Sequence, residues 1–439
     1  MLKRKIYEDL LYWKENRGQE CLLIKGARQI GKTYIVEQFA KKEYESFIEI
    51  NFFAEPELKQ IFEGNLTGDE IKKRISSNIP NVEFIPHKTL IFLDEIQKCS
   101  KARVALKFLA QCQDVDVIAS GSLLGLSYGQ DADKTVEMVD SIPVGYERQI
   151  FMYSMDFEEF LWANGYGQDA ISYLKEYYEK KEKVPSSIND KYEELLREYL
   201  VVGGMPEVVA DFVKNKNFNT VQKIQEKILN SYSDDIVNHA NSIEKIKVKR
   251  VYDSVPNQLA RENKKFKFSE VEGGGTSRKY IDSLSWLKNA NLIYICYNLC
   301  NPVLPLKFNK KENEFKAYIH DTGLLLAMYG FATKRALLNN TLIGFAKGGI
   351  YENFIAEALI KKGYDIYYYK PDDTLELEFV IEKEDGIMPI EVKAGNSATK
   401  SLNKFVEKFE PKMALKFTSG NIGVVDKKIT LPHYMVMFL

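Results

Sequence analysis

The sequence of 439 residues, 45% of them hydrophobic, is long enough for roughly three domains that each bury a core. Its 61 basic and 62 acidic side chains nearly cancel, which excludes a global electric field that would draw the molecule to nucleic acid or membrane. Any contact with nucleic acid would therefore have to come from a local basic surface.

The cysteines and the apolar segments bear on the cellular compartment. The cysteines are odd in number and form no CxxC pair, which argues against a disulfide framework or a zinc site. They are Cys21, Cys99, Cys112, Cys296 and Cys300, of which the last two are expected to be buried in the strand-like run LIYICYNLC. The segment MLKRKIYEDLLYWKENRG is too polar for a signal peptide, and no stretch approaches the ~18 apolar residues of a membrane span. A reducing cytoplasm and no membrane contact are therefore expected.

Up to about residue 154, short apolar runs alternate with segments of helical periodicity. Residues 5–16 are predicted to form an amphipathic helix with Ile6, Leu10 and Trp13 on one face. Apolar runs of strand length follow, separated by helical stretches, at 21–25, 47–53, 89–94, 115–120 and 148–153. This alternation predicts an α/β unit with a parallel sheet covered by helices on both faces.

Three further segments are expected after this unit. Residues 155–235 are predicted to be helical, with a surface turn at Pro185 inside a charge-rich stretch. Residues 236–340 contain the helical segment SRKYIDSLSWLKNA followed by a strand. From 341 to 439 the predicted order is one helix, three strands and one helix.

The stretch GARQIGKTY joins the first predicted strand to a helical segment and fits the Walker A pattern G-x-x-x-x-G-K-[ST]. Its glycines let the backbone turn so that N–H groups face an anion at the helix N-terminus. Lys32 would neutralise phosphate charge, and the Thr33 hydroxyl would coordinate Mg²⁺. The predicted nucleotide contacts are Gly26, Ala27, Arg28, Gln29, Ile30, Gly31, Lys32, Thr33 and Tyr34.

A pair of carboxylates follows the predicted strand 89–94. The run TLIFLDEIQKC places Asp94 and Glu95 at the end of that strand, as in a Walker B segment. We expect Asp94 to hold Mg²⁺ through water and Glu95 to polarise the attacking water. Together with Lys32 they are the predicted catalytic residues, so the site should hydrolyse as well as bind nucleotide.

Polar residues farther along offer additional nucleotide contacts. The next strand ends in IASGSLLG, where Ser120 or Ser122 would sense the terminal phosphate, although a serine–glycine turn explains the same letters. Arg148 opens the fifth strand and is a candidate arginine finger for a neighbouring subunit, with an ordinary surface arginine as the alternative.

The segments GARQIGKT, LIFLDEIQ, IASGSLLG and MYSMDFEEFLWA together resemble a prokaryotic family of AAA-type P-loop ATPases with an uncharacterised C-terminal half. The resemblance runs from end to end, through NQLARENKKFKFSEV, YIHDTGLL, GGIYENFIA, LELEFVIE and IEVKAG. It implies an α/β protein with an AAA-type ATPase core at 1–154 and a helical lid at 155–235. It further implies a winged-helix-like domain at 236–340 and a restriction-endonuclease-like domain, related to PD-(D/E)XK nucleases, at 341–439.

The middle segment has helices followed by a strand, which fits a winged helix. Polar and basic side chains would decorate its recognition helix at Ser277, Arg278, Lys279 and Lys288. Contact with DNA phosphates and a joint between proteins are both open for this region.

Acidic residues and one lysine in the last segment have the pattern of a metal-dependent nuclease. Strand alternation puts Glu391 and Lys393 on one face. With Glu378 opposite them, the carboxylates would hold Mg²⁺ while Lys393 orients water, and Glu352 would complete the cluster. The family shows aspartate where this chain has Glu378, and Mg²⁺ tolerates such a displaced carboxylate poorly. A nuclease fold kept as a docking or DNA-gripping platform is the alternative.

The run YIHDTGLL suggests a catalytic role for His320 and Asp321, but aspartate before a helical apolar run favours a helix N-cap.

The sequence thus predicts a Mg²⁺-dependent protein of the AAA type that binds and hydrolyses ATP, with a C-terminal module that engages nucleic acid or a protein. DNA is favoured over RNA as a partner, and a second copy of the chain is a further candidate. Two alternatives stay open. One is an ATP-gated metal-dependent nuclease, and the other is a signalling scaffold in which nucleotide controls assembly and the nuclease-like domain is inactive.

Overall fold

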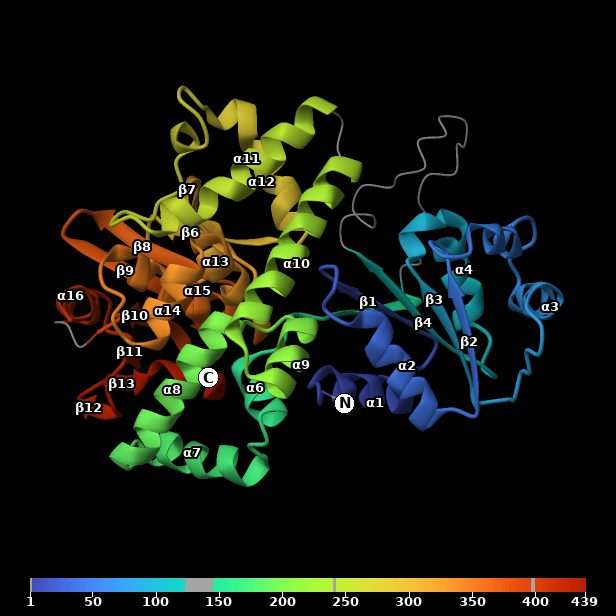
Figure 1. Ribbon diagram of the computed structural model, residues 1–439, viewed down its shortest axis with the longest axis horizontal. Helices are drawn as coiled ribbons and strands as arrows, with labels where there is room; N and C mark the ends of the chain where they lie inside the picture. Colours follow the sequence, from blue (N-terminus) through green and yellow to red (C-terminus); the bar gives the residue numbers. More distant parts are fainter. Residues whose placement is uncertain (1, 123–144, 240–241, 396–398) are drawn as a thin grey trace. The chain divides into compact units, whose positions relative to one another are not determined.

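The computed structural model in Figure 1 describes residues 2–122, 145–239, 242–395 and 399–439. Its contacts form two compact units, Arg4–Tyr153 and Ser154–Leu439, the second together with Met1–Lys3. The predicted segment 1–154 corresponds closely to the first unit. The three segments predicted beyond it all lie within the second unit.

The first unit is built on a parallel sheet with the strand order β2-β3-β4-β1-β5. Its strands are β1 (Cys21–Gly26), β2 (Ser46–Asn51), β3 (Thr89–Asp94), β4 (Asp116–Ser122) and β5 (Glu147–Phe151). Its helices are α1 (Ile6–Asn16), α2 (Lys32–Glu43), α3 (Gly68–Asn78) and α4 (Ser100–Ala110), with short 3₁₀ turns at Pro56–Phe62 and Ile96–Lys98. The predicted first helix and the five predicted strands are confirmed, with ends that differ by two residues at most.

The order of the strands explains the two covered faces. β3 is buried along its whole length, because it lies between β2 and β4 and has helices over both of its faces. The connection from β1 to β2 crosses the sheet in one direction, and the connections from β2 to β4 cross in the other. Right-handed crossovers therefore put α2 on one face and α3 and α4 on the other, as Figure 1 shows. Leu23, Ile71 and Leu106 meet in the core under α3 and α4.

The second unit combines helices with a mixed sheet of eight strands in the order β12-β13-β11-β10-β9-β8-β6-β7. Its first helices are α6 (Phe157–Ala163), α7 (Gln168–Lys180), α8 (Ser186–Val202), α9 (Pro206–Asn215), α10 (Phe218–His239), α11 (Ser242–Leu259) and α12 (Ser277–Asn289). Its later helices are α13 (Thr322–Tyr329), α14 (Phe331–Leu338), α15 (Phe345–Lys361) and α16 (Lys400–Phe409). Its strands are β6 (Ile293–Leu299), β7 (Lys310–Ile319), β8 (Tyr367–Asp372), β9 (Leu375–Lys383), β10 (Gly386–Val392), β11 (Ala414–Thr418), β12 (Gly423–Val425) and β13 (Lys428–Pro432).

Most elements of this unit follow the sequence patterns. The turn at Pro185 separates α7 from α8, and α12 is followed by β6 as predicted. The predicted helix–three strands–helix order of the last segment is confirmed as α15, β8, β9, β10 and α16. Cys300 is exposed, contrary to the expectation of burial, because β6 ends at Leu299.

One feature of the mixed sheet was not expected. β6 pairs in parallel with β8, with Tyr297 opposite Tyr367, so the β6–β7 hairpin extends the sheet of the C-terminal strands. Strands from both sides of residue 340 therefore share one hydrogen-bonded sheet. In Figure 1, α16 and α15 lie on opposite sides of this sheet.

Asp321 ties the helices of this unit together. One carboxylate oxygen accepts the N–H of Leu324 at 3.1 Å, which confirms the predicted N-cap of α13. The other oxygen accepts the N–H of Gly204, in the turn between α8 and α9, at 2.7 Å. Among the described residues, the helices all fall short of the length and hydrophobicity needed to cross a bilayer.

His320, next to this cap, should make the second unit sensitive to acid. The ring is buried, with Nδ1 3.2 Å from the Leu292 carbonyl oxygen and Nε2 3.4 Å from the Tyr232 hydroxyl. Burial lowers the pKa of His320 from 6.5 to about 4, although Asp321 opposes this change. Between these values the unfolded chain binds a proton that the folded chain does not. The free energy of unfolding should therefore decrease as the pH is lowered from 6.5 to 4, by at most about 1.4 kcal/mol per pH unit.

Urea denaturation at pH 7 and pH 5 tests this assignment. In His320→Asn the amide can still donate to the Leu292 carbonyl, but it does not titrate, so the loss of stability between the two pH values should be smaller than in the unmodified protein. His87→Asn, at an exposed position, serves as the control. An equal loss in the His320→Asn protein would contradict the assignment.

Candidate functional site

The loop after β1 has the backbone of a phosphate-binding turn. β1 ends at Gly26 and α2 begins at Lys32, with Gln29 and Gly31 at left-handed φ angles of 63° and 88°. A Cβ atom on Gly26 would lie 2.3 Å from the carbonyl oxygen of Met152, just after β5. Only glycine fits there, so the loop starts in close contact with the neighbouring chain segment.

Arg4 holds the outer side of this loop. Its guanidinium is buried and donates through Nη1 to the Ile30 carbonyl at 3.1 Å and through Nη2 to the Tyr153 carbonyl at 2.7 Å. The loop is therefore fixed to the end of β5 by a charged side chain. Arg4 could not be identified from the sequence, because an arginine ahead of the first helix belongs to no motif.

Lys32 lies buried inside the loop. Its amine donates to the carbonyl oxygens of Gly26 at 3.2 Å and Ala27 at 2.8 Å. Burial lowers the pKa of Lys32 to about 8, and the nearby carboxylates of Glu95 and Asp94 oppose this change. A buried ammonium ion gains more from an anion than from neutral carbonyl groups, so the position suits a phosphate oxygen.

The parallel register gathers polar side chains at the carboxyl ends of the strands. Asn51 lies opposite Asp94 in the β2–β3 pair, and Ser120 lies near the end of β4. The Asp94 carboxylate accepts hydrogen bonds from the Thr33 hydroxyl at 2.9 Å, from the Asn51 amide at 3.2 Å and from the Ser120 hydroxyl. Thr33 and Asp94 are therefore in direct contact. One hydroxyl and one carboxylate, with a helix N-terminus beside them, are oxygen ligands that fit a Mg²⁺–nucleotide site.

Glu95 continues from Asp94 in an unusual backbone conformation. Its φ is 54°, in the left-handed region, and its N–H donates to the Asp94 carboxylate at 3.0 Å. Its own carboxylate accepts from the Gln97 amide at 2.5 Å. Since Glu95 raises the pKa of Lys32, it lies within electrostatic range of that amine. Its place beside the loop is compatible with the predicted role toward water.

The other predicted contacts are placed differently. Ser122 lies opposite Gly26 at the end of β4, but its side chain is outside the described part of the structure. Arg148 lies opposite Leu22, toward the other end of β1, and donates to the Glu20 carboxylate at 2.9 Å. Within its own chain, Arg148 therefore lies at the end of the β1–β5 strand pair that is away from the phosphate loop. A role in a neighbouring subunit stays a prediction.

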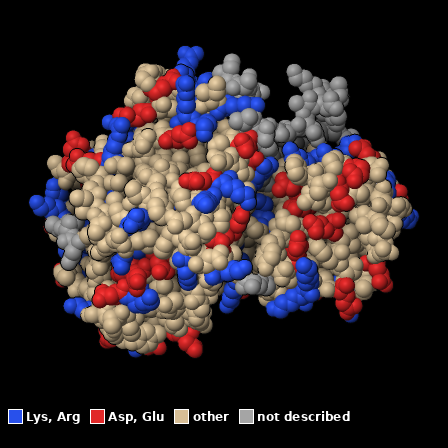
Figure 2. All heavy atoms as spheres, viewed as in Figure 1, with Lys and Arg blue, Asp and Glu red and all other residues tan. Residues whose placement is uncertain are grey.

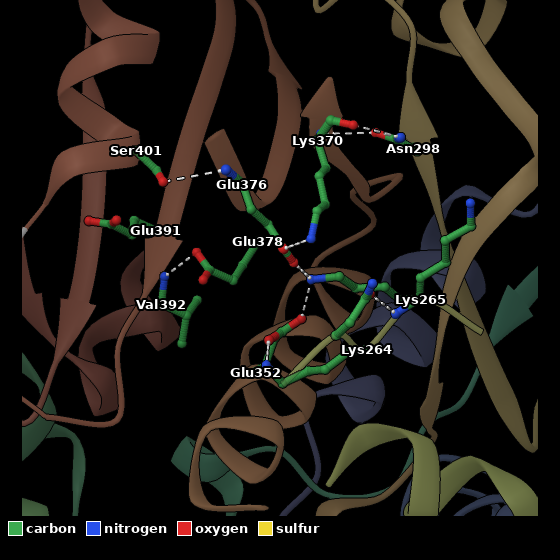
Figure 3. Close-up of polar contacts among 12 residues, drawn as sticks. Lys264, Lys265, Asn298, Glu352, Lys370, Glu376, Glu378, Glu391, Val392 and Ser401 are labelled. Atoms are coloured by element: carbon green, nitrogen blue, oxygen red, sulfur yellow. Dashed lines mark hydrogen bonds and ion pairs between the residues drawn. The ribbon is translucent and has the colours of Figure 1, made fainter. Parts of the chain in front are cut away.

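A second set of charged residues lies in the mixed sheet (Figure 3). The Lys393 amine is 2.9 Å from a carboxylate oxygen of Glu378 and 3.6 Å from one of Glu391. The other Glu378 oxygen accepts the N–H of Val392 at 3.0 Å. Glu391 keeps one buried oxygen without a hydrogen-bond partner, and burial raises the pKa of Glu391 to about 7. The predicted Glu378, Glu391 and Lys393 are thus brought together.

Glu352, the fourth predicted member, is held by other groups. One of its oxygens accepts from the Lys316 amine at 2.8 Å and the Tyr318 hydroxyl at 2.6 Å, and the other is 3.2 Å from the Lys264 amine. Burial alone would raise the pKa of Glu352, but Lys264 and Lys316 lower it to about 2. Within the described residues, no three side chains of histidine, cysteine, aspartate or glutamate are grouped as metal ligands. Metal binding at this cluster stays a prediction.

Lys316 links Glu352 to a residue that the sequence did not single out. Its buried amine is 2.9 Å from a carboxylate oxygen of Glu376, whose other oxygen is 2.8 Å from Lys370. The carboxylates of Glu352 and Glu376 therefore both lie against the Lys316 amine. The available signal for Glu376 was its position two residues before Glu378, on the same face of β9. Nothing local pointed to Lys316, because β7 is distant from β9 in the sequence.

Comparisons with solved structures give matches of low similarity. A Walker-type ATPase of Pyrococcus abyssi is 14% identical, with a TM-score of 0.43, over 75% of this chain and 96% of that one. The origin recognition complex of Drosophila bound to DNA matches at 12% identity and a TM-score of 0.26, over 74% and 86%. A STAND signal-transduction ATPase with a tetratricopeptide-repeat sensor from Pyrococcus horikoshii matches at 13% and 0.27, over 82% and 46%. All three TM-scores are below 0.5, and no curated protein matches the sequence.

Family models give a clearer assignment. Residues 18–161 match an AAA domain, and this range contains the phosphate loop with Asp94 and Glu95. Residues 193–335 and 347–433 match two domains of unknown function, DUF8612 and DUF4143. The chain therefore carries an AAA-type P-loop ATPase domain, followed by two domains whose role is unknown.

Proposed function

We propose that the protein binds MgATP at the loop between β1 and α2 and hydrolyses it. The observation that carries this proposal is the 2.9 Å contact between the Thr33 hydroxyl and the Asp94 carboxylate, beside the buried amine of Lys32. The match of residues 18–161 to an AAA domain supports the same class of activity.

Each side chain has a distinct task in this proposal. Lys32 would exchange its neutral carbonyl partners for phosphate oxygens, which carry the negative charge that the carbonyl groups lack. Thr33 and Asp94 would hold Mg²⁺, which supplies positive charge to the phosphate oxygens when it is bound. Glu95, the residue that follows Asp94 in the sequence, would accept a proton from the attacking water.

We further propose that the second unit contains a winged helix that engages DNA, with a protein partner as the alternative. The support is the order of α12 and the antiparallel β6–β7 hairpin, with Arg278 and Lys288 exposed on α12. Lys279 is less available, because it is paired with Glu272. On the face drawn in Figure 2, basic and acidic side chains are interspersed, so a DNA contact there would depend on a small local group.

A second candidate function is favoured by the convergence of Lys393 on Glu378 and Glu391. These residues would support a metal-dependent nuclease whose cutting is gated by the ATPase domain. The lysines already bound to Glu352 and Glu376 favour instead a nuclease-like fold that serves as a binding platform.

Substitutions at the phosphate loop test the ATPase proposal. Lys32→Ala should abolish ATP binding, because the phosphates lose their buried cation. Glu95→Gln should retain binding but lower turnover by about 100-fold or more, because the proton acceptor is lost. Binding and phosphate release are measured with radiolabelled ATP, with Lys41→Ala on the exposed face of α2 as the control. Undiminished turnover in Glu95→Gln would remove the catalytic assignment.

ATP turnover in the presence of nucleic acids tests the partner. We expect duplex DNA to stimulate turnover more than single-stranded DNA or RNA does. Arg278→Ala combined with Lys288→Ala should reduce this stimulation, and added salt should weaken it. Lys175→Ala, on the exposed side of α7, should leave it unchanged. If no nucleic acid changes the rate, the protein partner and the scaffold alternative gain support.

Cleavage of labelled DNA and RNA with Mg²⁺ or Mn²⁺, with and without ATP, tests the nuclease candidate. That candidate predicts products that disappear in Lys393→Ala and in Glu391→Gln and persist in Lys412→Ala, whose side chain is largely exposed. Substrate that stays intact with the unmodified protein under all these conditions would eliminate the nuclease and leave the binding platform.

A further inference from the structure

A cavity of about 750 Å³ lies in the second unit among α8, α14 and the turn between α9 and α10. Neither the phosphate loop nor the charged cluster of the mixed sheet contributes to it. Its volume lies in the range of small-molecule sites in proteins. Its lining differs from most such sites because it is largely polar, with four asparagines and six charged side chains.

Lys334 is the most unusual residue of this lining. Its side chain is completely buried, and its amine donates to the side-chain oxygen of Gln225. The Gln225 amide nitrogen donates to the carbonyls of Val201 at 3.0 Å and Val202 at 2.8 Å, which turns the oxygen toward Lys334. The amine is therefore held in one position by a neutral partner.

The charge of Lys334 is poorly compensated. Burial lowers the pKa of Lys334 to about 7, and Glu226 and Asp321 oppose this change from a distance. Among the described residues, no carboxylate lies within 4 Å of the amine as an ion-pair partner. Burying an ammonium ion without an anion is costly, and an anionic ligand in the cavity would repay that cost.

Other cations in the lining also favour an anionic ligand. Arg197 lines the cavity from α8, and its Nε is buried without a hydrogen-bond partner in the described structure. Lys216 and Arg335 line the more exposed part. Of the two acidic residues in the lining, Glu194 is already paired with Lys191 at 3.1 Å. Cations thus outnumber carboxylates by four to two.

The remaining lining supplies hydrogen bonds and apolar surface. α10 begins in the wall of the cavity, so the positive end of its dipole adds to the same potential. The aromatic rings of Phe218 and Phe331 provide flat apolar surface near the cations. Several cations around one cavity match a doubly charged phosphate better than a singly charged carboxylate.

We propose that this cavity binds a small phosphate-bearing ligand, up to the size of a nucleoside monophosphate, with the phosphate next to Lys334 and Arg197. The ligand would be either a free phosphate or a phosphate ester whose organic part packs on the aromatic rings. This site is separate from the ATP site and would be present even if the chain did not hydrolyse ATP.

Titration calorimetry on the full chain tests the proposal with three probes: orthophosphate, pyrophosphate and AMP. The chain carries Lys32→Ala, so that the phosphate loop contributes no binding. At least one probe should bind, and adding Lys334→Met should weaken it by about tenfold or more. Lys214→Met, on the exposed surface of α9 outside the lining, should leave the affinity within about twofold.

The three probes also distinguish the ligand. Tighter binding of AMP than of orthophosphate indicates a nucleotide, and equal or weaker binding of AMP indicates a free phosphate; either result supports the site. If Lys334→Met does not fold, as judged by circular dichroism, Arg197→Gln takes its place with the same expected loss. The proposal is overturned if no probe binds at millimolar concentration, or if the substitutions leave the affinity unchanged. ATP turnover of Lys334→Met with Lys32 intact should equal that of the unmodified protein, which separates this test from that of the ATPase.

Discussion

The hydrogen-bonded position of Asp94 is the constraint on which the phosphate site depends. Parallel pairing brings the carboxyl ends of β2, β3 and β4 to one edge of the sheet, and there a single carboxylate joins three elements. It accepts from Thr33 at the start of α2, Asn51 at the end of β2 and Ser120 in β4. Because α2 is fixed in this way, the loop before it has little freedom. Arg4 and the tight approach of Gly26 to Met152 restrict its other side.

The two charged sites differ in the kind of group that satisfies their carboxylates. In the first unit, Asp94 accepts from two hydroxyls, a side-chain amide and the Glu95 backbone N–H, and all of these donors are neutral. The negative charge of Asp94 is therefore available to a cation from solution. In the second unit, ammonium groups already lie against Glu352 and Glu376, and they hold the pKa of each carboxyl at about 2. There the protein itself supplies the compensating charge.

How far the sequence could predict these sites depends on the distance over which each signal acts. The phosphate loop and Asp94 were found because each lies in a short motif at the end of a buried strand. Glu391 and Lys393 were found for the same reason, through strand alternation. Asn51 and Lys316 were missed, because their importance comes from a strand register that no local pattern encodes. The cavity around Lys334 was missed likewise, since its lining comes from helices that are separated in the chain.

Because β6 pairs with β8, the two domains of unknown function depend on each other for stability. The matched ranges end at residue 335 and resume at 347, yet the sheet continues across that gap. A polypeptide that starts after the gap would lack β6 and β7. It would leave β8 as an unpaired edge strand and Glu352 without its partner Lys316. Orphaning such a charge costs about 3–5 kcal/mol, a large part of what keeps an ordinary domain folded. Gene rearrangements that separate the two matched ranges should therefore be selected against, and the two domains should be inherited together.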